Sequence, residues 1–361
     1  MQWLVLILII PYFYLLLKIY TCLLKIKPFG NGKPAELFIS VVVACRNEGK
    51  NLPFLLQNLS EQDYGHDLFE IIVVDDNSSD NTLAYASSFS GIKNLRVIEN
   101  AGSGKKQAIR TGIKASSGDI IITTDADCRM GKRWLSAIAS FCSEKNPEMA
   151  ICPVKMESNP GFFGYFQELE FLSLQGVTAG TATAGNPVMC NGANLAFART
   201  TYNRNSDNLH DELLSGDDVF LLHSIRKDPG IKILWFESDK ALVTTTAPQT
   251  VTAFLRQRAR WISKAGAYKD TFTLLLAIVI FVTILLQISL FIAGFFDPVF
   301  FLVFLVAFVI KSIPDFLILR NRASRYRKSR LMKWFLPSQI VYPFYVISVT
   351  IYSFTMGRRW K

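Results

Sequence analysis

Histidine is scarce in this sequence, and cysteine has no paired spacing. The chain of 361 residues has three histidines, His66, His210 and His223, which are scattered without a ligand pattern and argue against a zinc site. Its six cysteines form neither a paired metal motif nor the framework of a small disulfide-rich domain. We therefore expect reduced thiols, as in the cytosol.

Charge is almost absent from two long apolar stretches. Residues 1–24 contain one charged residue, Lys18, and residues 271–294 contain none. Because about 20 apolar residues span a bilayer, each stretch predicts a membrane helix. The first stretch lacks the basic start, the shorter apolar core and the small-residue cleavage site of a signal peptide, which favours an uncleaved anchor.

Two further apolar stretches follow. Residues 298–319 predict another span, although Lys311, Pro314 and Asp315 interrupt its far end. Residues 335–356 are uncharged but contain two prolines, so a kinked or re-entrant helix is an alternative to a span. The sequence thus predicts one amino-terminal and three carboxy-terminal membrane segments.

The excess of positive charge, +10, lies largely beside these stretches. The basic residues concerned are Lys25, Lys27, Lys33, Arg320, Arg322, Arg325, Arg327, Lys328, Arg330 and Lys333. Positive residues beside spans mark the cytoplasmic side and attract anionic lipids, so membrane lipids rather than nucleic acid are the expected partners. We expect an integral protein of the cell membrane with a cytoplasmic globular part. Four spans would export the basic tail at 358–361, whereas a re-entrant last segment would not.

Residues 35–250 have an ordinary globular composition and predict an α/β fold. Four short apolar runs that end in polar residues predict buried parallel strands within residues 36–52, 69–82, 95–100 and 118–128. In open parallel sheets ligands bind beyond the carboxyl ends of the strands. Two of these ends carry paired carboxylates, so we expect a site there.

The two carboxylate pairs differ in what they imply. Asp75 and Asp76, followed by Asn77 and Ser78, also suit a turn and a helix N-cap. Asp125 and Asp127 leave a buried strand one residue apart, where like charges repel. A hard divalent cation, Mg²⁺ or Mn²⁺, shared with a substrate phosphate, would balance them.

Three further segments allow both a functional and an ordinary interpretation. "AGSGKKQAIRTGI" (101–113) fails the P-loop pattern at Glu99 and Lys106, but its glycine-rich turn and Lys105 can attract phosphate or form a simple solvated turn. Asp217 and Asp218 begin an expected helix, where they oppose the macrodipole or supply a general base. "LRQRARWISKAG" (255–266) is typical of a basic interfacial helix with a tryptophan anchor.

In this order, "DDNSSD", "DAD", "GDD" and "QRARW" resemble the motifs of family 2 glycosyltransferases. These are the inverting, membrane-associated GT-A enzymes that include cellulose, chitin and hyaluronan synthases and ceramide glucosyltransferase. "VVVACRNEGKNL", "GKKQAI" and "NGANLAF" are similar to other segments of that family, and the resemblance covers about residues 38–265. It implies a cytosolic, Rossmann-like GT-A domain over residues 35–265, flanked by the membrane segments.

The resemblance also implies roles for individual residues. Asp218 would be the catalytic base, with a swap of roles with Asp217 left open because the family often has Glu-Asp there. Arg260 would offset the charge of the leaving diphosphate. The implied donor-binding residues are Ala44, Arg46, Glu48, Asp75, Asp76, Lys105 and Asp125; the implied acceptor-binding residues are Gly192, Asn194, Gln257 and Trp261; the implied metal ligands are Asp127 and Asp125.

The expected reaction is transfer of a sugar, with inversion, from a nucleotide-diphosphate donor such as a UDP-sugar to a hydroxyl group. The acceptor is either a growing polysaccharide, for which four spans would need an oligomer or a partner subunit, or a lipid. For the lipid acceptor, the aromatic segment 161–176 could lie at the membrane surface, although core-facing helices often look the same. A membrane receptor or transporter with a nucleotide-binding domain is a distant alternative, suggested by Lys311 and Asp315 inside a span.

Overall fold

The computed structural model describes residues 2–30, 32–209, 216–228 and 230–355, which fall into two compact units. The helical unit comprises Met1–Ile26, Ser158–Val188 and Ala247–Met356, and the sheet unit comprises Lys27–Glu157 and Met189–Thr246. His210 and the basic tail at 358–361 lie outside the described residues.

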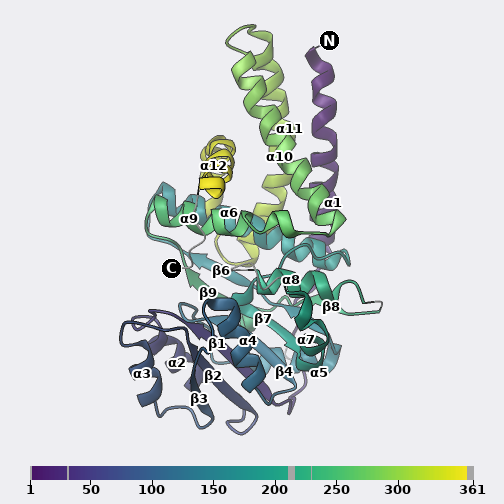
Figure 1. The fold of residues 1–361 in the computed structure, drawn as a ribbon. Coiled ribbons are helices and arrows are strands. Elements are labelled where there is room, and N and C mark those ends of the chain that lie inside the picture. The colour runs from purple at the N-terminus through teal and green to yellow at the C-terminus, as the bar shows by residue number, and fades with distance from the viewer. Residues whose placement is uncertain (1, 31, 210–215, 229, 356–361) are drawn as a thin grey trace. The chain divides into compact units, whose positions relative to one another are not determined.

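The sheet unit is built on a seven-stranded, mostly parallel sheet (Figure 1). Its strand order is β3-β2-β1-β4-β7-β5-β8, and β7 runs antiparallel to both of its neighbours. The strands are β1 (Ile39–Cys45), β2 (Phe69–Asp75), β3 (Leu95–Glu99), β4 (Ile120–Asp125), β5 (Met149–Ile151), β7 (Leu195–Ala198) and β8 (Ile233–Trp235). A second, two-stranded parallel sheet joins β6 (Val154–Glu157) to β9 (Val243–Thr246).

The four predicted strands are confirmed as β1 to β4. All residues of β1 and β2 are buried, as expected for central parallel strands covered on both faces. The register sets Cys45 opposite Asp75, and Ala44 opposite Asp125. The carboxyl ends of β1, β2 and β4 therefore meet at one edge of the sheet.

Among the described residues of the sheet unit, six α-helices accompany the strands. They are α2 (Leu52–Ser60), α3 (Thr82–Ser88), α4 (Lys105–Ala115), α5 (Trp134–Lys145), α7 (Arg199–Asn205) and α8 (Asp217–Ile225). Helix α4 lies close to β1 and β2 because Gly112 has no side chain; a Cβ there would lie 2.5 Å from Val42 Cγ1 and 3.0 Å from Val74 Cγ2. This close packing fixes the amino-terminal end of α4, where Lys105 begins the helix.

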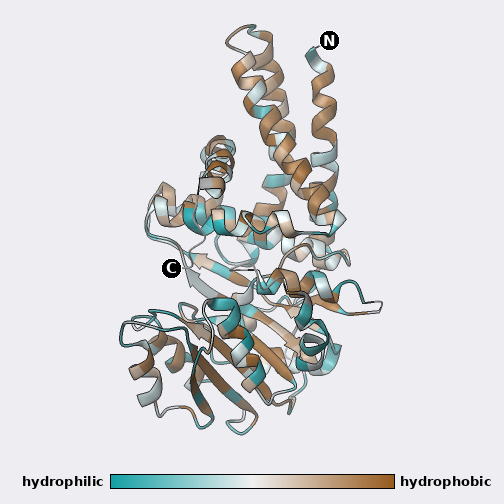
Figure 2. Cartoon of the chain, viewed as in Figure 1, coloured by the Kyte–Doolittle hydropathy of each residue, from teal (hydrophilic) through white to brown (hydrophobic). Residues whose placement is uncertain are grey.

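The helical unit contains six α-helices. They are α1 (Ile10–Leu24), α6 (Phe162–Thr183), α9 (Val251–Ile262), α10 (Thr271–Ala293), α11 (Val299–Arg325) and α12 (Phe335–Thr355). Four helical segments are long and apolar enough to cross a membrane: Gln2–Leu24, Thr271–Ala293, Val299–Arg325 and Ser329–Phe354. Figure 2 shows apolar residues along most of α1, α10 and α11. Helix α11 continues six residues beyond Leu319, the expected end of its apolar stretch. These six residues no longer form an apolar stretch, but their backbone is still helical.

Helix α6 is a core helix of this unit. Most of its residues from Gly164 to Ala182 are buried, which supports the core-facing interpretation of segment 161–176. Gly176 faces Ile318 of α11 and Gly180 faces Ile19 of α1, and an added Cβ would lie 2.4 Å and 2.5 Å from the respective Cγ2 atoms. Small residues of this kind let membrane helices approach closely.

The two charges inside the third span pair with each other. Lys311 Nζ lies 2.8 Å from Asp315 Oδ2, one helical turn away, and donates to Gln339 Oε1 at 2.6 Å. Tyr12 Oη donates to Asp315 Oδ1 at 2.6 Å. These contacts link α1, α11 and α12, so a structural ion pair accounts for the charges that suggested a receptor or transporter.

Candidate functional site

The carboxyl ends of the parallel strands bring acidic side chains to one place. Asp75 ends β2 and Asp125 ends β4, on either side of β1. Asp127 follows in the turn after β4, where its Oδ2 accepts a hydrogen bond from the Thr245 hydroxyl of β9 at 2.9 Å. Thr245 carried no signal in the sequence, because only the fold brings β9 to this turn.

Asp125 and Asp127 together favour a cation. Burial raises the pKa of Asp127, and the negative charge of Asp125 raises it further. A bound cation would remove this penalty on the ionised carboxylate. No group of three or more His, Cys, Asp or Glu side chains with metal-binding geometry occurs among the described residues. The pair therefore suits Mg²⁺ or Mn²⁺, which take one or two carboxylates and complete their shell with water and phosphate oxygens.

Lys105 contacts Asp125 and is influenced by the charges of two further carboxylates. Its Nζ donates to Asp125 Oδ1 at 2.5 Å. Burial alone would lower the pKa of Lys105, but the charges of Asp125, Asp217 and Asp218 outweigh burial and raise it above its ordinary value. The end of β4 and the start of α8 thus direct carboxylates toward one ammonium group.

Asp218 is held at both carboxylate oxygens. The backbone N–H of Gly192 donates to Oδ2 at 3.0 Å, and the N–H of Val219 donates to Oδ1 at 2.8 Å. The side chain is half-buried at the first turn of α8. These bonds fix the orientation of the carboxylate, as a general base requires. Gly192, expected near the acceptor, thus holds the candidate base through its backbone.

Asp76 organises the loop that carries Lys105. Its carboxylate is fully buried and accepts hydrogen bonds from Gly104 N at 2.9 and 3.0 Å and from Asn100 Nδ2 at 2.6 Å. Arg46 Nη1 lies 3.5 Å from its Oδ2. Gly104 has a φ of +94°, a conformation that favours glycine. Asp76 therefore acts within the protein, in line with the turn interpretation of this motif.

Asp75 differs from its neighbour because one of its oxygens has no partner. Oδ2 accepts from Ser78 N at 3.0 Å, whereas Oδ1 is buried and accepts no hydrogen bond from the described residues. A buried acceptor of this kind suits an N–H or O–H group of a ligand. Nearby, Glu48 accepts from Asn51 Nδ2 at 2.8 Å and adds negative charge close to Asp127.

Asn194 belongs to the scaffold of the sheet unit. It is fully buried, and its Nδ2 donates to the carbonyl oxygens of Pro153 at 2.8 Å and Ala241 at 2.7 Å. Its Oδ1 accepts from Trp134 Nε1 at 3.0 Å. The side chain has no exposed atom left for an acceptor, which departs from the role that the sequence resemblance implied.

The remaining predicted residues, Gln257, Arg260 and Trp261, lie on α9 of the helical unit. Arg258 between them is 2% exposed and pairs with Glu170 of α6, with Nη2 2.6 Å and Nε 3.1 Å from Oε2. Its guanidinium also lies 4.2 Å from the centre of the Trp261 ring. Arg258 thus anchors α9 to α6. The basic composition of segment 255–266 did not reveal this role.

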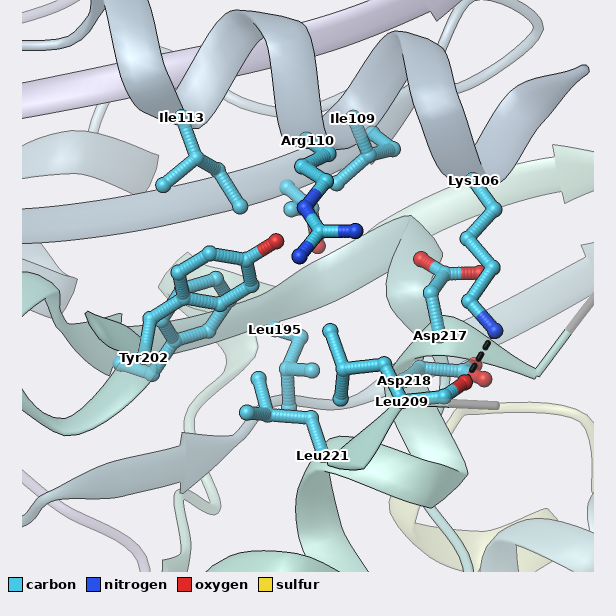
Figure 3. Close-up of a pocket in the computed structure, with 12 residues that line it drawn as sticks. Lys106, Ile109, Arg110, Ile113, Leu195, Tyr202, Leu209, Asp217, Asp218 and Leu221 are labelled. Carbon is cyan, nitrogen blue, oxygen red and sulfur yellow. Dashed lines mark hydrogen bonds between the residues drawn. The ribbon is translucent and has the colours of Figure 1, made fainter. Parts of the chain in front are cut away.

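A small pocket lies behind Asp217 and Asp218 (Figure 3). Its volume of about 10 Å³ admits roughly one water molecule, so it cannot hold a nucleotide. Lys106 lines this pocket, is 6% exposed and donates to the backbone carbonyl of Leu209. The sequence pattern marked Lys106 only as a mismatch to the P-loop, whereas the structure shows a buried side chain that ties α4 to the segment before α8.

Comparison with known proteins identifies similar chains. The family model described as "Glycosyl transferase family 2" matches residues 40–205. A protein named glycosyltransferase AglE, from Haloferax volcanii, is 37% identical over 108 residues, which cover 29% of this chain and 36% of that protein. A poly-beta-1,6-N-acetyl-D-glucosamine synthase from Staphylococcus epidermidis is 23% identical over 260 residues, which cover 68% of this chain and 60% of the synthase.

A solved structure resembles nearly the whole chain. It is the mannosyltransferase PcManGT from Pyrobaculum calidifontis, in complex with GDP-Man and Mn²⁺. The match has a TM-score of 0.61 at 19% identity, and it covers 98% of this chain and 99% of the mannosyltransferase. At this identity the likeness concerns the fold.

Proposed function

We propose that the protein transfers a sugar from a nucleotide-diphosphate donor to an acceptor hydroxyl at a membrane, because residues 40–205 match the model of glycosyl transferase family 2 and the chain shares its fold with a mannosyltransferase. The relatives named above carry glycosyltransferase names, but their alignments cover only part of their length.

The contact of Lys105 with Asp125, next to Asp127, is the observation that supports this proposal most strongly. Asp217 and Asp218 at the start of α8 add negative charge that acts on the same lysine. A diphosphate with a divalent cation supplies the mixed charges that such an arrangement would bind. The complex of the structurally similar mannosyltransferase with GDP-Man and Mn²⁺ supports the same class of ligand.

The roles of the residues follow from their contacts. Asp127 and Asp125 would hold Mg²⁺ or Mn²⁺, which supplies Lewis-acid stabilisation of the leaving diphosphate. Asp75 would accept a hydrogen bond from the nucleoside through its free Oδ1. Asp218, held by Gly192 and Val219, would take the proton of the acceptor hydroxyl as it attacks, which inverts the anomeric carbon. Arg260 and Trp261 would serve the diphosphate and the acceptor.

The acceptor is a polysaccharide or a membrane lipid. The similarity to a polysaccharide synthase favours polymer extension. The four membrane-length helices favour any acceptor that reaches the bilayer, including a lipid that receives a single sugar. The size of the product separates the two: a ladder of lengths indicates a polymer, and one extractable glycolipid indicates a lipid acceptor.

The test is turnover of the full chain in detergent or native membranes with a panel of labelled sugar nucleotides. We expect release of a nucleoside diphosphate from at least one donor, and we expect EDTA to abolish it and Mn²⁺ or Mg²⁺ to restore it. The Asp218→Asn variant is the matched negative control. Failure to release a nucleoside diphosphate from any donor, with either metal and with native lipids present, would refute the proposal.

A further inference from the structure

Contacts of helix α4 with the rest of the sheet unit fix the position of Lys105. Its helix begins at Gly104, whose N–H is bound by the buried carboxylate of Asp76. Farther along α4, Gly112 allows close packing on Val42 and Val74. The start of α4 is therefore tied at two points, and the Lys105 side chain reaches from it to the carboxylate that ends β4.

The contact between Lys105 and Asp125 involves a carboxylate that the cation would also use. The ammonium lies 2.5 Å from Asp125 Oδ1, and the two side chains are 27% and 33% exposed. Both groups are accessible enough for a ligand to reach them. Asp127, two residues on, is not bound by Lys105 and is instead held by Thr245.

We propose that the ammonium group of Lys105 competes with a divalent cation for the carboxylate of Asp125. When the donor binds, Lys105 releases this carboxylate and binds the donor diphosphate instead. This inference rests on the proposed function. The ammonium group of Lys105 would thus either neutralise Asp125 or bind the donor, but it could not do both at once. No covalent step is involved, and the exchange conserves the number of charged pairs.

The inference predicts effects of opposite sign from one substitution. Replacing Lys105 by Gln removes the competitor, so the affinity for Mn²⁺ alone should rise. The same change removes a partner of the diphosphate, so the affinity for a nucleoside diphosphate with Mn²⁺ present should fall. If Lys105 only bound the donor, the substitution would lower the affinity for the nucleoside diphosphate and leave the affinity for Mn²⁺ unchanged. If Lys105 only supported the fold, the substitution would raise neither affinity.

The experiment measures Mn²⁺ binding to the full-length protein in detergent from the electron paramagnetic resonance signal of free Mn²⁺. Lys105→Gln is compared with Lys105→Arg, which keeps the charge, and with Lys114→Gln, an exposed lysine on the same helix. We expect Lys105→Gln to bind Mn²⁺ about twofold to fivefold more tightly, as fits the loss of one partly exposed ion pair. Both control variants should bind like the unchanged protein.

A second titration follows UDP and GDP binding at saturating Mn²⁺, with Lys105→Gln expected to bind more weakly by a similar factor. If Lys105→Gln binds Mn²⁺ no more tightly while the unchanged protein binds metal and releases nucleoside diphosphate, the competition is refuted and the proposed function stands. If the unchanged protein binds neither Mn²⁺ nor any nucleoside diphosphate, both are refuted. A gain in Mn²⁺ affinity shared by Lys105→Arg would also overturn the inference, because that variant retains the competing charge.

Discussion

At the scale of single residues, Asp127 and Asp218 are held by different hydrogen bonds, so substitutions at the two positions should have different effects. Asp218 accepts two backbone hydrogen bonds and is the proposed base, so Asp218→Asn should lower kcat by about 10²–10⁴-fold. Its affinities for Mn²⁺ and nucleotide should stay within about twofold, because the amide keeps the size of the side chain. Asp127→Asn, in contrast, should lose Mn²⁺ binding.

Turnover assays and the Mn²⁺ titration together check this division of roles. Donor binding that weakens as much in Asp218→Asn as in Asp127→Asn would show that Asp218 is not the base. If Asp217→Asn instead gave the isolated loss of kcat, the roles of the two neighbouring aspartates would be exchanged.

Asn194 allows a stability prediction at the same scale. Asn194→Ala would leave the Trp134 indole N–H and the buried carbonyl of Ala241 without the partner that Asn194 supplies, and each such group costs about 1–3 kcal/mol. The carbonyl of Pro153 would keep its hydrogen bond from Val243 N. We expect a clear fall in the thermal unfolding midpoint of detergent-solubilised protein. Asn203→Ala, at an exposed position of α7, should leave the midpoint unchanged. An Asn194→Ala variant with normal stability and weaker acceptor binding would restore the acceptor role that the sequence implied.

The residues of the site were predictable to different degrees. Asp125 and Asp127 could be predicted as a cation site because their spacing after an apolar strand already sets like charges side by side. The buried state of Asp76 could not, because its partners Asn100 and Gly104 lie 24 and 28 residues away along the chain. The same limit applies to Lys105: a lysine at a glycine-rich turn indicates a phosphate partner, whereas its contact with Asp125 depends on the order of β1, β2 and β4.

At the scale of elements, the packing of α6 depends on its glycines. In Gly180→Ala the new methyl would lie 2.5 Å from Ile19 Cγ2 and 2.8 Å from the Ile19 carbonyl oxygen of α1. Because backbone must move to relieve the second contact, we expect a loss of about 1–3 kcal/mol. Thermal unfolding in detergent measures it, and Gly266→Ala is the matched control, since no atom lies within 4 Å of its added Cβ. Equal midpoints for the two variants would show that α1 and α6 can separate without cost.

The long elements were predictable and the short ones were not. The runs at β1, β2 and β4 are apolar and six or seven residues long, so their strand character is visible in the sequence. Strands β5 to β9 have three or four residues each, too few for a pattern to emerge, and the antiparallel direction of β7 is set by its neighbours. Likewise, segment 161–176 looks amphipathic, but only the contacts of Gly176 and Gly180 identify α6 as a core helix.

At the scale of the whole molecule, hydropathy predicts where membrane helices occur but not where they end. Helix α11 runs on to Arg325 because arginine and asparagine can continue a helix that apolar residues began. Its carboxy-terminal part and the segment after it carry Arg320, Arg325, Arg327, Arg330 and Lys333, whereas the turn before it, from Gly294 to Pro298, has no basic residue. This asymmetry gives α11 an orientation by the positive-inside rule.

The orientation can be tested with two single-cysteine additions. Phe296→Cys lies at a position that is 87% exposed, and Ser329→Cys lies at an exposed position in the basic segment. In intact cells a membrane-impermeant maleimide should label Phe296→Cys, and it should label Ser329→Cys only after permeabilisation, because the basic segment should face the cytoplasm. The unchanged protein gives the background, since five of its six cysteines are buried and Cys190 is partly buried. Labelling of Ser329→Cys from outside would reverse the orientation and place the basic segment away from the nucleotide sugars of the cytoplasm.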